Sequence, residues 1–330
     1  MELKLNQPPL ICYLHHAYPL TVAMENEDFN SWFLSNYIQL EYRLKSDELN
    51  FFTYVICGNS VLIPLIDYRA LDLDFIFKTN IDIIDFIRNS INIGYYVTTY
   101  IDEFFISDRE AYQKFHFRHE IMIYGFDSDK QIFNVIGFNH IHSYVASIVS
   151  FTELRESLLN SIDKKNDLIL LKAKDEDSYH PTYNFDIENV KTLLHDYLFS
   201  INSSERFRPI GTINNFTYGI SVYNELIKYY QGIIQDDNKE CDFRHFSVLY
   251  EHKKTMLSRL QYLIDKKYLS FNNNYISIFS ELQNISYERR NSILKYNYTK
   301  NKEIIKVTID SLQKMSYIEK STVENLLGDI

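Results

Sequence analysis

Apolar residues along the chain follow two spacings, and these predict where helices and strands lie. In residues 80–94, Ile84, Ile87 and Ile91 are three or four positions apart, which is the spacing of one helix face. Gly94 stands where the C-cap of such a helix is expected. The pattern therefore predicts an amphipathic helix in the first half of the chain.

Strand-like runs follow this helix. Residues 95–101 are β-branched and aromatic, and they predict a strand that ends at Asp102. Residues 119–126 and 132–138 predict two more strands, joined by the turn-forming sequence Asp-Ser-Asp-Lys. Shorter strand-like runs precede them at 51–57 and 60–65. The strand ending at Asp102 and the one beginning at His119 are expected to be antiparallel neighbours, which places both residues at one end of the sheet.

The second half of the chain has a mostly helical pattern. Ser150 and Glu153 form a capping box that starts a helix. Helical spacing recurs in three later stretches, at 187–197, 249–263 and 281–327. We therefore predict an α+β domain over residues 1–149 and a mostly helical domain over residues 150–330.

The composition narrows the classes of function. The chain has 27 Tyr and 23 Phe but only 8 Gly and 6 Pro, as expected of a folded globular protein. Neither GxGxxG nor GxxxxGK[ST] occurs, so the sequence offers no glycine-rich phosphate-binding loop. A net charge of −10 argues against nucleic acid as the main partner.

Cysteine usage and the first residues indicate the compartment. Cys12, Cys57 and Cys241 lack CxxC spacing and predict neither a disulfide framework nor a zinc site. The N-terminus lacks the basic start and apolar core of a signal peptide, and no apolar run approaches the ~20 residues that cross a bilayer. We therefore expect a cytoplasmic protein with no membrane partner.

Cys12 and His119 are the candidate catalytic residues. Cys12 opens an apolar, helix-compatible run, Cys-Tyr-Leu-His-His-Ala-Tyr. A thiol at a helix N-terminus has its pKa lowered toward the reactive thiolate. A histidine that is distant in sequence can meet such a thiol in space and act as its base. A cysteine followed much later by a histidine at the start of a strand is the order found in papain-like cysteine enzymes.

Longer motifs resemble one family. Residues 94–106 read Gly-Tyr-Tyr-Val-Thr-Thr-Tyr-Ile-Asp-Glu-Phe-Phe-Ile, and residues 119–127 read His-Glu-Ile-Met-Ile-Tyr-Gly-Phe-Asp. With Tyr112 between them, these segments are similar to the N-terminal domain of butirosin biosynthesis protein H and its relatives in antibiotic gene clusters. Residues 242–259, which include the sequence Glu-His-Lys, resemble a helical stretch of the same family.

The resemblance implies a papain-like fold for residues 1–149, with a helix packed on an antiparallel sheet. Cys12 matches the family's cysteine and His119 its histidine. The namesake moves an acyl group from a carrier-protein thioester to an amine. The resemblance therefore implies an amide-forming acyltransferase of natural-product biosynthesis with a Cys-linked acyl-enzyme. Its partners would be an acyl or peptidyl carrier protein, whose phosphopantetheine holds the substrate, and a small-molecule amine. No metal or organic cofactor is required.

The third catalytic residue and the oxyanion hole are open. The family often has an Asp near the end of the strand after the hairpin, where this chain has Asn134 and Asn139. Orienting an imidazole needs only a hydrogen-bond acceptor, so Asp102 or either asparagine can serve. We favour Asp102, because of its expected position at the end of the sheet. For the oxyanion hole, Gln7 and Asn6 are the side-chain candidates, and the backbone N–H of Cys12 is preferred to either as the donor.

Other interpretations remain. A non-catalytic binding or scaffold protein with this fold accounts for the missing Asp, and the same cysteine acting with water gives a peptidase or thioesterase. His15, His16, His116 and His119 are of a type that binds zinc. The basic residues of 289–302 form either a solvated helix face or a docking surface for an acidic carrier protein.

Overall fold

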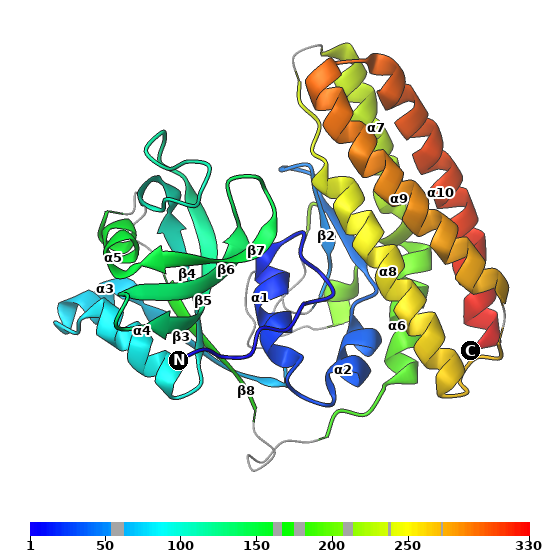
Figure 1. Cartoon of the computed structure of the whole chain (residues 1–330). Coiled ribbons are helices and arrows are strands. Elements are labelled where there is room, and N and C mark those ends of the chain that lie inside the picture. Colours follow the sequence, from blue (N-terminus) through cyan, green and yellow to red (C-terminus); the bar gives the residue numbers. More distant parts are fainter. Residues whose placement is uncertain (54–62, 161–166, 175–181, 207–213, 237–238, 272) are drawn as a thin grey trace. The chain divides into compact units, whose positions relative to one another are not determined.

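The structure is a computed structural model of the whole chain, and it describes all residues except 54–62, 161–166, 175–181, 207–213, 237–238 and 272. The chain divides into two compact units (Figure 1). The first consists of Met1–Phe29 and Gly58–Pro181, and the second of Asn30–Cys57 and Thr182–Ile330. Helices and antiparallel sheets occur together, so the predicted mixed α+β character is confirmed.

The first unit is built on a six-stranded antiparallel sheet in the order β3-β8-β4-β5-β6-β7. Ile101 pairs with His119 and Asp102 with Arg118, which confirms that the two predicted strands are antiparallel neighbours. The strands are β3 (Ile66–Asp72), β4 (Tyr96–Asp102), β5 (Arg118–Asp127), β6 (Ile132–Phe138), β7 (Tyr144–Ser150) and β8 (Asp167–Ala173).

The division between the units differs from the boundary expected at residues 149 and 150. That boundary lies inside the first unit, because β8 returns to pair with both β3 and β4. The second unit in turn takes Asn30–Cys57 from the N-terminal side. Of the short runs predicted as strands, 51–57 overlaps the end of a strand only at Phe51. Residues 54–62 lie outside the described part of the chain.

Helices cover both faces of the six-stranded sheet. One apolar core joins α3 (Leu73–Lys78), α4 (Ile83–Asn92) and α5 (Phe151–Leu159) to inward-facing strand residues that include Val97 and Ile101. The helix α1 (Leu14–Ala23) lies on the opposite side of the sheet (Figure 1). A short 3-10 helix, η3 (Glu103–Phe105), follows β4 directly.

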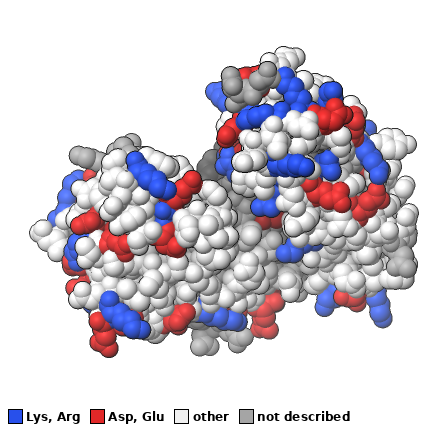
Figure 2. Space-filling view, turned by 45° about the horizontal axis from the view of Figure 1, so that its top comes forward, with Lys and Arg blue, Asp and Glu red and all other residues white. Residues whose placement is uncertain are grey.

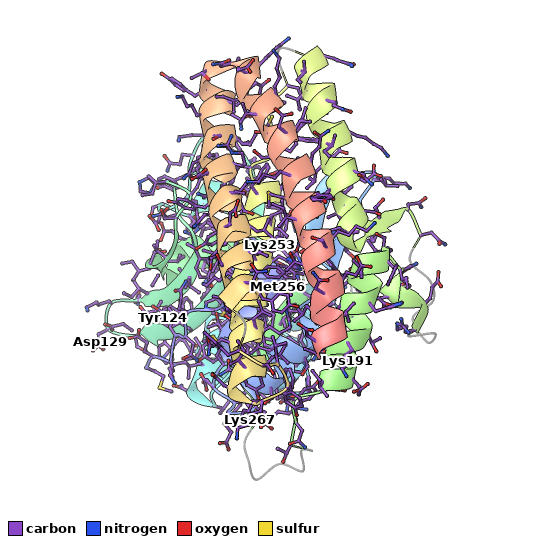
Figure 3. The ribbon with its side chains drawn as sticks, turned by 90° about the vertical axis from the view of Figure 1, so that its right-hand side faces the viewer. Tyr124, Asp129, Lys191, Lys253, Met256 and Lys267 are labelled. Carbon is purple, nitrogen blue, oxygen red and sulfur yellow. The ribbon has the colours of Figure 1, made fainter. Side chains whose placement is uncertain are left out.

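The capping box and the turn predicted from the sequence are both present, whereas the C-cap of α4 is Ile93 and not Gly94. Asp82 caps α4 through Ile84 N and Asp85 N, and Gly94 just after this helix has a φ of 90°. Ser150 and Glu153 make both hydrogen bonds of a capping box at α5. In the β5–β6 turn, which carries the labelled Asp129 in Figure 3, Asp127 accepts hydrogen bonds from the backbone N–H groups of residues 129 and 130.

The second unit combines a small sheet with long helices. Its sheet has the order β2-β1-β9, formed by β1 (Leu40–Arg43), β2 (Glu48–Phe51) and β9 (Phe216–Tyr218). The region 281–327, expected to be helical, belongs to two helices. The helices of the unit are α2 (Phe29–Asn36), α6 (Ile187–Phe199), α7 (Val222–Gln235), α8 (Arg244–Asp265), α9 (Asn273–Thr299) and α10 (Lys302–Asp329). Among the described residues, no helix is both long and apolar enough to span a membrane.

Buried side chains of α8 hold the segment Asn30–Cys57 in the second unit. Arg259 donates hydrogen bonds to the carbonyl oxygens of Leu34 and Tyr37, at 2.8 and 2.7 Å. His252 Nε2 contacts the carbonyl oxygen of Ile38 at 2.8 Å. The last carbonyls of a helix have no partner within it, so α8 supplies donors at the end of α2 that the local sequence lacks.

Candidate functional site

His119, near the start of β5, is oriented by a carboxylate. Its Nδ1 lies 2.7 Å from Oε1 of Glu103. The imidazole is 31% exposed, whereas the carboxylate is 6% exposed. The rings of Phe117 and Phe138 flank the imidazole. A carboxylate accepts the Nδ1 proton, which leaves the lone pair of the histidine on Nε2, the form required of a general base.

The pleat of the sheet explains why Glu103 is the partner. Directly paired residues share a face, so His119 lies on the same face as Ile101. Side chains alternate along a strand, so the residue two positions after Ile101 returns to that face. The backbone N–H of Glu103 donates to the carbonyl of Phe117 at 2.8 Å, which extends the pairing by one residue beyond β4.

Asp102 does not orient His119, contrary to our expectation. Its Oδ2 lies 2.7 Å from Nδ1 of His116, and its Oδ1 accepts from the backbone N–H groups of Phe104 and Phe117. The hydroxyl of Ser157 in α5 accepts a hydrogen bond from the backbone N–H of Asp102 and donates one to its carbonyl oxygen. At 1% exposure, this carboxylate anchors the segment between β4 and β5.

The other predicted polar residues lie elsewhere. Asn134 pairs with Gly125, six residues along β5 from His119, which corresponds to about 20 Å of strand. The side chain of Asn139 accepts hydrogen bonds from backbone N–H groups of the β6–β7 turn. Gln7 is exposed, and no contact of its side chain identifies an oxyanion hole. Neither asparagine takes the place of Glu103.

Cys12 precedes α1 and is partly exposed. Tyr13 is the N-cap residue of this helix, so the thiol lies just outside the first turn and not within it. The side chain of Tyr13 does not cap the helix. The first N–H groups of a helix point back toward the residues that precede it, so the dipole of α1 favours negative charge before Leu14.

The contacts of α1 fix its direction relative to the sheet. The Tyr18 hydroxyl donates to the carbonyl of Glu120, which pairs with Tyr100 near the end of β4. After the helix, Glu25 accepts a hydrogen bond from Tyr96 at the beginning of β4. The helix therefore runs antiparallel to β4, and it begins at the end of the sheet where β4 ends and β5 starts. Cys12 and His119 belong to the same end of the sheet.

The remaining cysteines and histidines do not form a second centre in the described structure. Cys241 is buried, and burial raises the pKa of its thiol to about 12. Cys57 lies outside the described residues. Over the ranges that the structure describes, no group of three or more His, Cys, Asp or Glu side chains is placed to hold a metal ion. His116 and His119, two of the proposed zinc ligands, are instead paired with carboxylates.

The basic residues of 289–302 lie on α9 and between α9 and the start of α10. Arg290 donates to the Ser247 hydroxyl and lies over the ring of Phe243, and Lys300 lies over the ring of Tyr296. On the face that Figure 2 shows, basic and acidic side chains are interspersed. Lys295 and Lys302 complete this set together with Arg289, which lies 3.9 Å from Glu288.

Sequence reasoning missed Glu103. The signal that could have found it is the alternation of side chains applied to the expected pairing of β4 with β5. No protein-family model matches the chain, and no curated protein matches it either.

Proposed function

We propose that the first unit is a papain-like cysteine acyltransferase with Cys12 as nucleophile and His119 as base. The observation that carries this proposal is the His119–Glu103 pair, an oriented and solvent-reachable imidazole at the end of the sheet where α1 begins. The motifs at residues 94–106 and 119–127 support the substrate class, a carrier-protein thioester, and the acceptor, an amine.

The residues would act in two half-reactions. His119 Nε2 takes the proton of the Cys12 thiol, and the thiolate attacks the thioester carbonyl. The carrier thiol leaves with the proton from the imidazolium, and the acyl group remains on sulfur. An amine then attacks this acyl-enzyme and gives a proton to His119, which returns it to Cys12 as the amide departs. Amide formation from a thioester is downhill and needs no nucleotide.

The proposal requires the thiol to reach the imidazole around the end of the sheet. His119 shares the face of Val97 and Ile101, whereas α1 lies on the other side (Figure 1). A reagent that spans a short gap, 1,3-dibromoacetone, tests this by bridging a thiolate and an imidazole nitrogen. Peptide mapping should find Cys12 linked to His119. Reaction at Cys12 without a bridge, or a bridge to His116, would contradict the catalytic pair.

Activity is tested by intact-mass analysis after incubation with an acylated carrier protein. We expect an acyl adduct on Cys12 that disappears when a primary amine is added, with release of the amide. Cys12→Ala should form neither adduct nor amide. Release of free acid in the presence of excess amine would indicate a thioesterase. A folded protein that takes up no acyl group from any carrier tested would favour the scaffold interpretation.

A further inference from the structure

Arg109 is a buried cation next to the pair His119–Glu103. Its side chain is 2% exposed, and its Nε lies 4.0 Å from the Glu103 oxygen that contacts His119. Its Nη1 lies 3.5 Å from a carboxylate oxygen of Asp108. Within the described part of the chain, neither Nη1 nor Nη2 has a hydrogen-bond partner. Burying a guanidinium is costly unless it meets opposite charge, so this position calls for an electrostatic explanation.

The guanidinium of Arg109 lies close to Gly137 of β6. A Cβ added at Gly137 would lie 3.4 Å from Arg109 Nη2 and 3.2 Å from the Tyr18 hydroxyl, so a larger residue would press on both groups. Burial, with the nearby Tyr144 and Glu120, raises the pKa of Tyr18, and the charge of Arg109 acts in the opposite direction. Glycine at this position lets the guanidinium approach α1.

We propose that Arg109 is a positioning residue that balances the charge of Glu103 and thereby keeps His119 neutral. A buried carboxylate attracts a proton to a neighbouring imidazole, because His⁺ and Glu⁻ together are neutral. A protonated imidazole cannot accept the proton of a thiol. With Arg109 present, the charge of Glu103 is already balanced without that proton.

The other charged groups around His119 leave this role to Arg109. Glu120 follows His119 in β5, so the two side chains point to opposite faces of the sheet, and burial raises the pKa of the Glu120 carboxyl against the opposing effects of Tyr100, His119 and Arg118. Arg118 lies over the Tyr100 ring, with its Cζ 3.7 Å from the ring centroid. Asp108 contacts Arg109 and is 30% exposed, so its charge is partly screened by water. Glu103 is the carboxylate in direct contact with the imidazole.

The consequence for catalysis rests on the proposed function, but the protonation state of His119 does not. NMR titration of the histidine Hε1 resonances measures that state in the full chain, with His119→Gln used for assignment. In Arg109→Gln, the midpoint of the His119 titration should move up by about one pH unit. Arg109→Lys should restore most of the change, because it keeps the charge. Arg155→Gln, which removes a surface arginine paired with Asp82, is the matched control.

The variant Glu103→Gln provides a second route if Arg109→Gln does not fold. It leaves Arg109 unbalanced and should lower the His119 midpoint. Adding Arg109→Gln to it removes both charges and should bring the midpoint back toward the wild-type value. The proposal would be overturned if Glu103→Gln and the double variant had the same His119 midpoint. It would also be overturned if Arg109→Lys and Arg109→Gln moved the midpoint equally.

The pH profile of Cys12 acylation separates this inference from the proposed function. If both hold, the acid limb of the profile should shift in Arg109→Gln by as much as the NMR midpoint. If Cys12 forms no acyl adduct but the midpoint shifts, Arg109 balances charge in a protein without this activity. If acylation occurs and its acid limb does not follow the midpoint, the positioning role is excluded.

Discussion

Both units hold a histidine close to a carboxylate, but the pair is partly exposed in the first unit and buried in the second. In the first unit, the His119 imidazole contacts Glu103 and is about one-third exposed. In the second, Lys253 Nζ lies 2.7 Å from Glu319 Oε2 and 3.0 Å from His252 Nδ1, and these side chains are at most 1% exposed. Lys253 lies on α8 one turn before Met256, within the helices of the unit (Figure 3).

Burial decides whether a histidine next to a carboxylate can take part in a reaction or only stabilise the fold. In the buried cluster, the Tyr223 hydroxyl also donates to Glu319, at 2.7 Å. Burial lowers the pKa of Lys253, against the attraction of Glu319, and burial together with the charge of Lys253 lowers the pKa of His252. These groups satisfy one another and cannot reach a substrate. His252 and Lys253, in the Glu-His-Lys sequence at 251–253, therefore link α8 to Glu319 of α10.

The largest effect is expected from removing the buried carboxylate. Glu319→Ala leaves Lys253 without its counter-charge and should lower the free energy of unfolding by about 3–5 kcal/mol. Urea unfolding followed by circular dichroism measures this. Glu281→Ala, which removes an exposed partner of Lys314, should change the free energy by less than about 1 kcal/mol. Similar losses in both variants would mean that the buried cluster contributes no more than a surface pair.

Cysteine reactivity sharpens the contrast between an accessible and a buried group. With a pKa of about 12, Cys241 has roughly one thiolate per 10⁴ molecules at pH 8, and its side chain is covered. Iodoacetamide should therefore modify Cys12 at least about 100 times faster, as peptide mapping over time would measure. Comparable rates at the two cysteines would remove the kinetic support for a nucleophile at Cys12.

Glu103 and Asp102 offer a test within the first unit. Glu103→Gln should lower the rate of Cys12 acylation about 10- to 100-fold, because the imidazole loses the acceptor that orients it. Asp102→Asn should mainly lower thermal stability, since that carboxylate holds His116 and two backbone N–H groups. Stopped-flow acylation and thermal unfolding of both variants give the two readouts. The reverse pattern would restore Asp102 as the orienting residue.

The smallest expected effect is a change in the free energy of unfolding with pH, caused by His252 in the second unit. The folded-state pKa of His252 is depressed by burial, so the unfolded chain binds a proton there that the folded chain does not. The contribution of this histidine to stability is complete above about pH 6.5 and falls by about 1.4 kcal/mol per pH unit below it. Urea unfolding at pH 5 and pH 7 should show this slope. His252→Gln, which can still donate to the Ile38 carbonyl, should lessen the slope by one proton.

Short sequence patterns were enough to predict several helices and turns. The isoleucines of α4, the capping box of α5 and the Asp-Ser-Asp-Lys turn each identify a structure from a few adjacent residues. The strand β8 and the division of the chain between the units were not predicted. Both depend on partners far away in sequence, since β8 pairs with β3 about 100 residues before it.

The candidate site likewise contains residues that were predicted from the sequence and residues that were not. The position of His119 beside the end of β4 followed from the strand-forming composition of the two segments and their expected antiparallel pairing, and it was confirmed by the register of β4 and β5. The choice between Asp102 and Glu103 depended on which side of the pleat each carboxylate occupies, and a one-residue difference reverses the answer. Arg109 lies in a loop without a periodic pattern, so its contact with Glu103 had no sequence signal.

The interleaved route of the chain imposes an order on its folding during synthesis. The carbonyl oxygens of Leu34 and Ile38 leave the ribosome more than 200 residues before their donors, Arg259 and His252. At 5–20 residues per second, that gap lasts roughly 10–40 s. All six strands of the first sheet emerge during this interval and can complete their pairing. The early segment Asn30–Cys57 therefore waits longer for its buried partners on α8 than the first sheet waits for its last strand.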